Sequence, residues 1–231
     1  MNRTLQEIER GVVACRACPR LVAHREKVAR HPPRRFAGEA YWARPVPGFG
    51  DGRARFFIVG LAPASHGGNR TGRVFTGDSS GDFLFAALHR AGFANQAPSV
   101  ARDDGLRLRE AWIAAAVRCA PPDNRPSPAE FHRCRPFLER EIAALPGLSV
   151  FLALGALAWK SALAACGATG WSVPRPLPRF AHGAEAKLIR PDGKRVVLLG
   201  SYHVSRQNTN TGRLTPAMFD QVLKRAKKLL G

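Results

Sequence analysis

Four short apolar segments constrain the fold of this chain more than any other feature. They cover residues 55–61, 111–117, 149–154 and 195–200. Each is rich in Val, Ile, Leu, Phe or Ala and gives way to glycine, proline or polar residues. Runs of this kind are typical of strands that are buried on both faces of a parallel sheet.

Segments with helical periodicity separate or follow these runs. They cover residues 2–14, 81–91, 127–145, 156–166 and 216–230. Ser127, followed three residues later by Glu130, predicts a capping box. Because strands alternate with helices, the sequence predicts an α/β fold with a mostly parallel, four-stranded central sheet, in a single domain over residues 1–231. Residues 31–51, rich in Pro, Gly and Arg, are predicted to form a surface connection.

The charge balance indicates a polyanionic partner. With 36 Lys and Arg against 17 Asp and Glu, the formal charge is +19, far more than solubility requires. Arginine-rich codon usage is the alternative explanation, and charge alone does not distinguish DNA, RNA and an anionic membrane. No apolar run is long enough to cross a membrane and no signal peptide is visible, so we expect a cytoplasmic protein.

Five cysteines in such a chain indicate metal or redox chemistry in place of disulfides. Cys15 and Cys18 form a C-x2-C pair, and Cys119 and Cys134 form a second pair after a predicted strand. Four thiolates fit either tetrahedral zinc or an iron–sulfur cluster, and their spacing does not separate these two groups. Buried, unreactive cysteines are the third interpretation, and the one we favour for Cys166, in an apolar helical segment.

Two polar loops follow predicted strands. Residues 60–84 hold six glycines and lead into a helix, and residues 200–216 hold His203 among Arg, Asn and Gln side chains. Glycine lets a backbone approach a ligand closely, and the carboxyl ends of parallel strands are where α/β folds bind ligands. The first loop has neither a G-K-[ST] motif nor a G-x-G-x-x-G motif, which argues against a nucleotide-cofactor site.

Four motifs together resemble the family 5 (type B) uracil-DNA glycosylases of bacteria and archaea. They are C-x2-C, GLAPASHGGNRTGRVFTGDSSG, RCAPPDNRPSPAEFHRC and SYHVSRQNTNTGRLTP, spread over residues 15–216. The resemblance implies a three-layer α/β/α fold and a monofunctional enzyme that hydrolyses the N-glycosidic bond of deaminated bases in DNA. It also implies a four-iron, four-sulfur (4Fe-4S) cluster on Cys15, Cys18, Cys119 and Cys134. We expect a nucleoid-associated monomer that acts on double-stranded and also on single-stranded DNA.

The resemblance further assigns roles to individual residues. Phe75 would stack on the flipped base, His203 would donate a hydrogen bond to uracil O2, Asp78 would be the carboxylate that assists catalysis, and Asn124 would add a polar group. Such a donor and carboxylate stabilise opposite ends of the transition state once the base has left the stack. Asp78 could instead cap the helix beginning near Ser79. The other assigned residues are Gly60, Ala62 and Ser205 for substrate binding, and Arg70, Arg206, Gln207, Asn208 and Arg213 for DNA binding.

Two positions depart from the related family 4. Leu61 replaces an acidic residue there, and Ala115 aligns with the asparagine that reads uracil, so the resemblance implies a roomier pocket that also accepts hypoxanthine and xanthine. No lysine stands in the motif loops for a Schiff-base lyase step. The alternatives are a non-catalytic DNA-damage binding module, a strict uracil glycosylase like family 4, and a zinc-dependent nucleic-acid enzyme.

Overall fold

A six-stranded sheet in the order β1-β3-β2-β4-β6-β5 forms the centre of the molecule, which a computed structural model describes over residues 3–231. The two outer strands, β1 (Phe49–Gly50) and β5 (Glu185–Ile189), run antiparallel to their neighbours. The mostly parallel sheet is therefore confirmed, although it has six strands where the sequence predicted four. The inner strands are parallel and are the four predicted ones: β2 (Phe56–Gly60), β3 (Ala111–Ala115), β4 (Val150–Leu154) and β6 (Arg195–Ser201).

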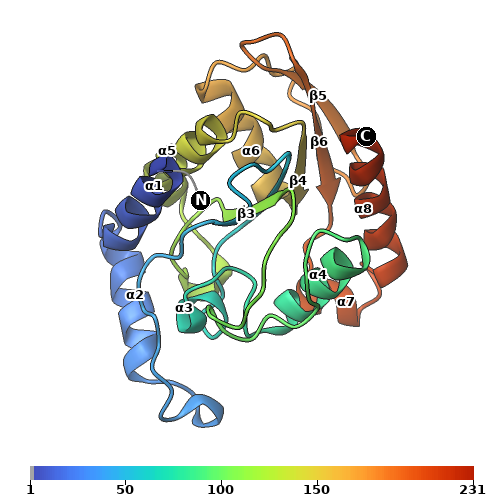
Figure 1. Ribbon diagram of the computed structural model, residues 1–231. Helices are drawn as coiled ribbons and strands as arrows, with labels where there is room; N and C mark the ends of the chain where they lie inside the picture. The colour runs from blue at the N-terminus through green and yellow to red at the C-terminus, as the bar shows by residue number, and fades with distance from the viewer. Residues whose placement is uncertain (1–2) are drawn as a thin grey trace.

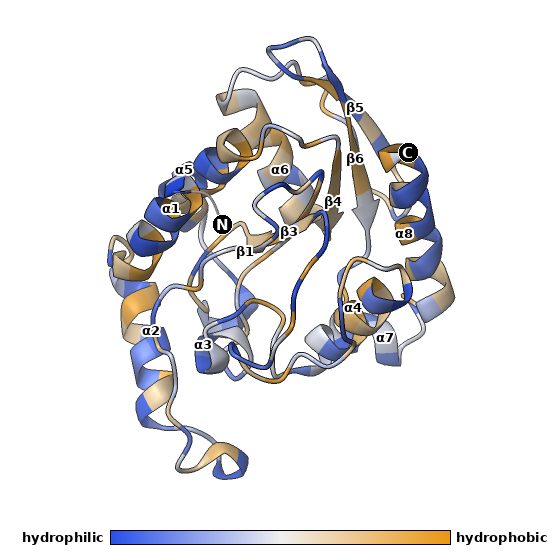
Figure 2. Ribbon diagram, in the orientation of Figure 1, coloured by the Kyte–Doolittle hydropathy of each residue, from blue (hydrophilic) through white to orange (hydrophobic). Residues whose placement is uncertain are grey.

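Helices cover both faces of this sheet, which gives the three expected layers (Figure 1). Alternate residues of a strand point to opposite faces. Thus Phe56 packs toward α4 (Ser79–Arg90) and α8 (Pro216–Leu230), whereas the next residue, Phe57, packs toward the other helical layer. That layer consists of α1 (Arg3–Ala14), α5 (Pro128–Ala144) and α6 (Ala156–Ala168). Figure 2 shows hydrophobic inner strands between helices whose outer residues are largely hydrophilic.

The predicted helices are present, and the predicted capping box lies at the start of α5. At the start of α5, Glu130 N donates to Ser127 Oγ at 3.3 Å and Ser127 N donates to Glu130 Oε2 at 2.7 Å, so the capping box is confirmed. The first helix is confirmed from Arg3 onward, while residue 2 lies outside the described residues. None of the helices in residues 3–231 is long and apolar enough to cross a membrane.

The remaining helices lie in the connections. They are α2 (Pro19–Arg30), η1 (Arg34–Phe36), α3 (Gly68–Thr71), η2 (Pro122–Asn124) and α7 (Arg206–Asn210). The prediction that residues 31–51 form a surface connection is wrong for their second half. Val46 is fully buried and its N–H donates to Arg118 O at 2.7 Å, and β1 then pairs with β3. The segment is buried because its backbone groups find partners along the edge of the sheet.

Candidate active site

A pocket of about 540 Å3 opens among the loops that follow the parallel strands. Asp78 from the loop after β2, Asn124 from the loop after β3 and Arg206 from the loop after β6 all line it. The structure therefore brings together two predicted catalytic residues, Asp78 and Asn124, and a predicted DNA-binding residue, Arg206, which lie far apart in the chain. This is the edge at which parallel sheets bind ligands.

The two carboxylate oxygens of Asp78 have different surroundings. Its Oδ1 atom accepts hydrogen bonds from Ser80 N and Gly81 N, both at 3.0 Å, and so caps α4. Its Oδ2 atom faces Gly67, which has no side chain to occupy the space, and accepts no hydrogen bond from any residue of the described chain. Burial raises the pKa of Asp78, although the two backbone hydrogen bonds lower it. The capping interpretation is confirmed, and it leaves one oxygen uncommitted.

Phe75 and His203 lie beside one another, with ring centroids 6.1 Å apart and ring planes inclined by 37°. Phe75 has a φ of +53°, which is unusual for a residue with a side chain. Its ring occupies the space next to Gly60, where an added β-carbon would lie 2.7 Å from the ring. Neither Phe75 nor His203 is among the residues that line the pocket of Asp78.

The imidazole of His203 is uncharged at neutral pH. Burial lowers its pKa to about 4. Among residues 3–231 no side chain or backbone group forms a hydrogen bond with the ring, while the backbone carbonyl of His203 accepts one from Asn208 Nδ2 at 2.8 Å. A neutral imidazole carries one N–H donor and one acceptor, so the ring has a donor to offer a ligand.

Small residues line the ends of two neighbouring strands at this edge. Gly60 and Ala115 are register partners of β2 and β3, and Ala115 is buried beside the core that Phe75 packs against. Ala62 packs against the cluster of cysteines, and Ser205 is the partly buried residue that precedes α7. Of the predicted substrate-binding residues, Gly60 therefore lies beside the Phe75 ring, whereas the roles of Ala62 and Ser205 stay predictions.

The predicted DNA-binding residues fall into two groups. Arg206 and Gln207 are exposed on α7, and the Arg213 guanidinium lies 4.7 Å from the centroid of the Tyr202 ring. Asn208 is already engaged with the His203 carbonyl. Of the predicted DNA-binding residues, those that are exposed lie on α7 and just after it.

Arg70 is held within the protein. Its guanidinium donates to His66 O at 2.9 Å, to Gly77 O at 3.0 Å and to Glu39 at 2.5 Å, and stacks on Phe36 at 4.3 Å. Only 14% of the side chain is exposed. These contacts show that Arg70 stabilises the glycine-rich loop, residues 60–84. A contact between Arg70 and DNA stays a prediction.

One wall of the pocket comes from residues that sequence reasoning missed. His24, Val28 and Phe36, from α2 and η1, line it together with the loop after β2. His24 Nε2 lies 3.2 Å from Ser65 Oγ, and a similar contact joins Tyr41 to His66 at 2.9 Å. No local pattern marks these residues, since they reach the site only through the packing of α2.

The four predicted metal ligands, Cys15, Cys18, Cys119 and Cys134, line one small buried cavity. Cys166 lies elsewhere, on the buried face of α6, as expected. Burial raises the pKa of Cys119 to about 11 and that of Cys134 to about 12. As placed, no three His, Cys, Asp or Glu side chains within the described chain are grouped to hold a single metal ion.

A buried arginine is directed at this cavity. Arg25 is 2% exposed, its Nη1 atom lies 2.9 Å from Cys119 Sγ, and its Nε atom has no hydrogen-bond partner. In the described part of the chain Arg25 forms no ion pair with a carboxylate. On the other side, Arg118 N donates to Cys134 Sγ at 3.2 Å. A buried cation needs an anionic partner, and a thiolate-ligated cluster would supply one.

Comparison with known proteins agrees with this fold. A family model described as the uracil DNA glycosylase superfamily matches residues 47–227, and the chain belongs to that superfamily. Within it, the chain groups with the type-5 uracil-DNA glycosylases.

Two relatives illustrate the similarity. The type-5 uracil-DNA glycosylase of Thermus thermophilus is 52% identical over 220 residues, which cover 95% of this chain and 95% of the relative. That of Mycobacterium bovis is also 52% identical, over 97% of this chain and 81% of the relative. By contrast, the type-4 uracil-DNA glycosylase of Archaeoglobus fulgidus is 28% identical over 62% of this chain and 55% of its own length.

Proposed function

We propose that this protein is a monofunctional DNA glycosylase that removes uracil from DNA and leaves an abasic site. The observation that carries the proposal is the pairing of the Phe75 ring with the uncharged imidazole of His203, 6.1 Å apart, with Phe75 on the same loop as the partly buried carboxylate of Asp78. The relatives of this chain bear the name of that activity.

Phe75 and His203 serve base recognition in this proposal. A target base must leave the duplex stack before its glycosidic bond can be reached, and it is then held by stacking and by hydrogen bonds. The Phe75 ring supplies the stacking surface. The His203 N–H donates to the carbonyl oxygen of the departing base, where negative charge develops as the bond breaks. Because the pKa of His203 is about 4, this donor is the neutral ring throughout the physiological range.

Asp78 acts on the sugar side of the bond. Cleavage gives the deoxyribose oxocarbenium character, which a nearby carboxylate stabilises. The Oδ2 atom is free for this role because only Oδ1 is needed for the helix cap. Asn124, on the same pocket, adds a polar group. The motif loops offer no lysine for covalent capture of the sugar, so the product is an intact strand with an abasic site.

The lack of a polar side chain at the ends of β2 and β3 supports a broader choice of base than uracil. Ala115 presents only a methyl group at the end of β3, and its register partner Gly60 presents none. A site without a fixed amide cannot reject a base by leaving polar groups unpaired. We therefore propose that hypoxanthine and xanthine are substrates as well as uracil.

DNA binds across α7 in this proposal. Arg206 and Gln207 are exposed there, and Arg213 follows at the turn after the helix. The formal charge of +19 supplies the attraction to the phosphate backbone. We propose a monomer on double-stranded and on single-stranded DNA.

Cys15, Cys18, Cys119 and Cys134 would hold a 4Fe-4S cluster. When bound, the cluster supplies a covalent link between the N-terminal segment and the loop after β3, and the hydrolysis needs no electron transfer. Arg25 would balance its negative charge. The same residue connects the cysteines to the active-site loop, because its carbonyl accepts a hydrogen bond from Asn69 at 3.3 Å.

A lesion panel tests the proposed activity. Oligonucleotides that contain uracil, hypoxanthine or xanthine are incubated with the protein, and abasic sites are then cleaved with alkali. We expect strand breaks with uracil and with the deaminated purines only after alkali treatment. Tight binding without breaks in any substrate would favour the non-catalytic damage-binding module, and breaks with uracil alone would remove the broader specificity.

A further inference from the structure

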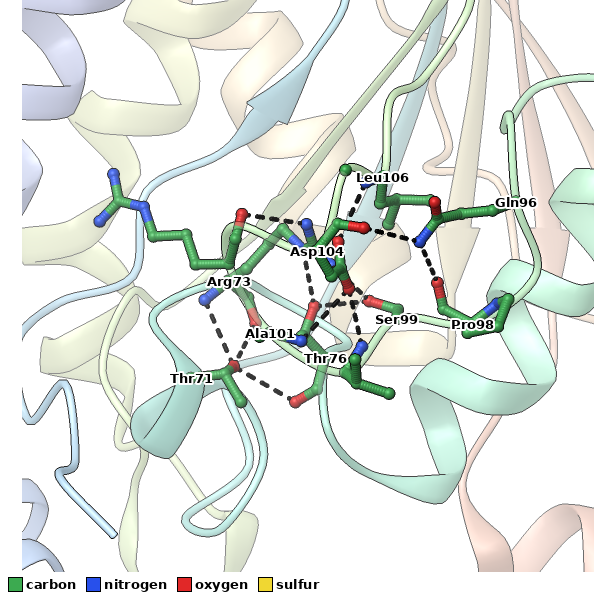
Figure 3. A network of polar contacts seen from close by, with 12 residues as sticks. Thr71, Arg73, Thr76, Gln96, Pro98, Ser99, Ala101, Asp104 and Leu106 are labelled. Carbon is green, nitrogen blue, oxygen red and sulfur yellow. Dashed lines mark hydrogen bonds and ion pairs between the residues drawn. The ribbon is translucent and has the colours of Figure 1, made fainter.

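A network of polar side chains joins the loop after β2 to the segment between α4 and β3 (Figure 3). Arg73, 5% exposed, forms an ion pair with Asp104 at 2.7 Å. Its Nε atom donates to Thr76 Oγ1 at 3.0 Å, and its Nη2 atom donates to Ser99 Oγ at 3.0 Å. The network thus connects the loop after β2 to the segment between α4 and β3. The proposed function gives that second segment no role.

Asp104 organises that second segment. Its carboxylate accepts hydrogen bonds from Val100 N at 2.8 Å, Ala101 N at 3.2 Å and Leu106 N at 3.0 Å, in addition to the Arg73 guanidinium. Burial raises the pKa of Asp104, but these hydrogen bonds outweigh that effect and lower it to about 2. Asp104 therefore remains ionised. Its hydrogen bonds hold the backbone of residues 100–106 in place beside the Arg73 guanidinium.

The network reaches the two residues that separate Phe75 from Asp78. Thr76 and Ser99 are fully buried, and their hydroxyl oxygens lie 2.8 Å apart. Gly77 N donates to Ser99 O at 2.8 Å. Side chains of α3 hold the carbonyl groups of Thr76 and Gly77 from the other side. The short linker between the aromatic platform and the carboxylate is therefore fixed on both sides.

We propose that Arg73, Ser99 and Asp104 are positioning residues that fix the separation of Phe75 and Asp78. Phe75 has a backbone conformation that is unfavourable for a residue with a side chain, so it persists only if its surroundings hold it. The network supplies that restraint immediately on both sides of Phe75. The inference rests on the proposed function, because it assigns the network to the geometry of that site.

Ser99→Ala and Arg73→Lys test the inference with the full-length protein. Ser99→Ala removes one hydroxyl and keeps the ion pair, and Arg73→Lys keeps the charge but loses the donor to Thr76. We expect base release from uracil-containing DNA in single turnovers to slow by roughly tenfold to a hundredfold, while the affinity for undamaged duplex of the same sequence is unchanged. Arg73→Ala is unsuitable, since it leaves Asp104 buried without its partner.

The matched control is Thr215→Ala. It removes a partly buried hydrogen bond, the 3.2 Å cap of α8 by Thr215 Oγ1, away from the loop after β2. We expect this variant to lose stability and keep the wild-type rate. If Ser99→Ala and Arg73→Lys are no slower than Thr215→Ala, the inference is overturned.

A double-mutant cycle separates positioning from general weakening of the fold. If Ser99 acts through the carboxylate, Ser99→Ala has little further effect in an Asp78→Asn background. An equal loss of rate in both backgrounds would overturn the inference. Failure of the proposed function looks different, since the wild-type protein would then release no uracil. Failure of the assigned site would leave Phe75→Ala and Asp78→Ala at the wild-type rate.

Discussion

The Oδ2 atom of Asp78 lies directly against the backbone of Gly67. A β-carbon on Gly67 would collide with that oxygen. Gly67→Ala is therefore expected to displace the carboxylate and to lower the single-turnover rate of base release by roughly a hundredfold. Gly147→Ala is the control, because the nearest atom to its added β-carbon is 3.6 Å away. A wild-type rate in Gly67→Ala would show that the position of this oxygen does not matter.

Two substitutions of Asp78 separate its cap from its charge. Asparagine keeps an oxygen for the N–H groups of Ser80 and Gly81 but loses the negative charge, whereas alanine loses both. We expect Asp78→Ala to lower the free energy of unfolding by about 1 kcal/mol and Asp78→Asn to leave it nearly unchanged. Both should release uracil slowly. Urea unfolding and single-turnover kinetics measure the two effects, and a fast Asp78→Asn variant would reduce Asp78 to a cap.

His203 makes the stability of the protein depend on pH in a definite direction. Its pKa falls from an ordinary value of 6.5 to about 4 on folding, so between these values the unfolded chain binds the proton and the folded protein does not. Stability is therefore lost as pH falls from about 6.5 toward 4. In His203→Asn the difference between the free energies of unfolding at pH 7 and pH 5 should be smaller. His24, His66 and His182, which burial shifts the same way, remain in the variant.

Arg206 and Arg70 should respond differently to removal, although both were assigned to DNA. Arg206→Ala is expected to weaken DNA binding and to reduce the slope of log affinity against log salt by about 0.9, as for one lost phosphate contact. Arg70→Ala instead removes internal hydrogen bonds, so it should lower the melting temperature and leave the slope unchanged. Titrations at several salt concentrations distinguish the two. A reduced slope in Arg70→Ala would restore it to the DNA interface.

The four clustered cysteines are expected to bind iron, and the fifth cysteine, Cys166, serves as a control. The wild-type protein should be brown and contain about four irons per chain. Cys134→Ser should lose iron and visible absorption, whereas Cys166→Ser should keep both, because Cys166 is buried in the core away from the other four. Stoichiometric zinc in the colourless wild-type protein would favour the zinc interpretation.

The inner strands could be predicted because burial on both faces makes each a continuous apolar run. The edge strands could not. β1 is only Phe49 and Gly50, and its pairing with β3 makes it a strand. β5 does alternate, with Ala186 and Leu188 inward, but five alternating residues among polar ones are a weak signal.

The candidate site, too, has a part that could be predicted from the sequence and a part that could not. Asp78, Asn124 and Arg206 meet because each follows a parallel strand, a relation that the order of strands and loops already contains. His24 and Phe36 could not be placed, because α2 reaches the pocket through tertiary packing. The burial of Arg70 could not be predicted either, because its partner Glu39 lies 31 positions away in a segment that the sequence predicted only as a connection.

Gly60 and Ala115 face each other as register partners in two hydrogen-bonded strands. The space left by the missing side chain of Gly60 is occupied by the Phe75 ring, and Ala115 beside it is buried. The sheet thus sets one boundary of the position of that ring, and a larger residue in place of Gly60 would displace it. Changes of substrate range among proteins of this architecture should therefore be found as single exchanges at the last residue of a strand, with the surrounding loops left as they were.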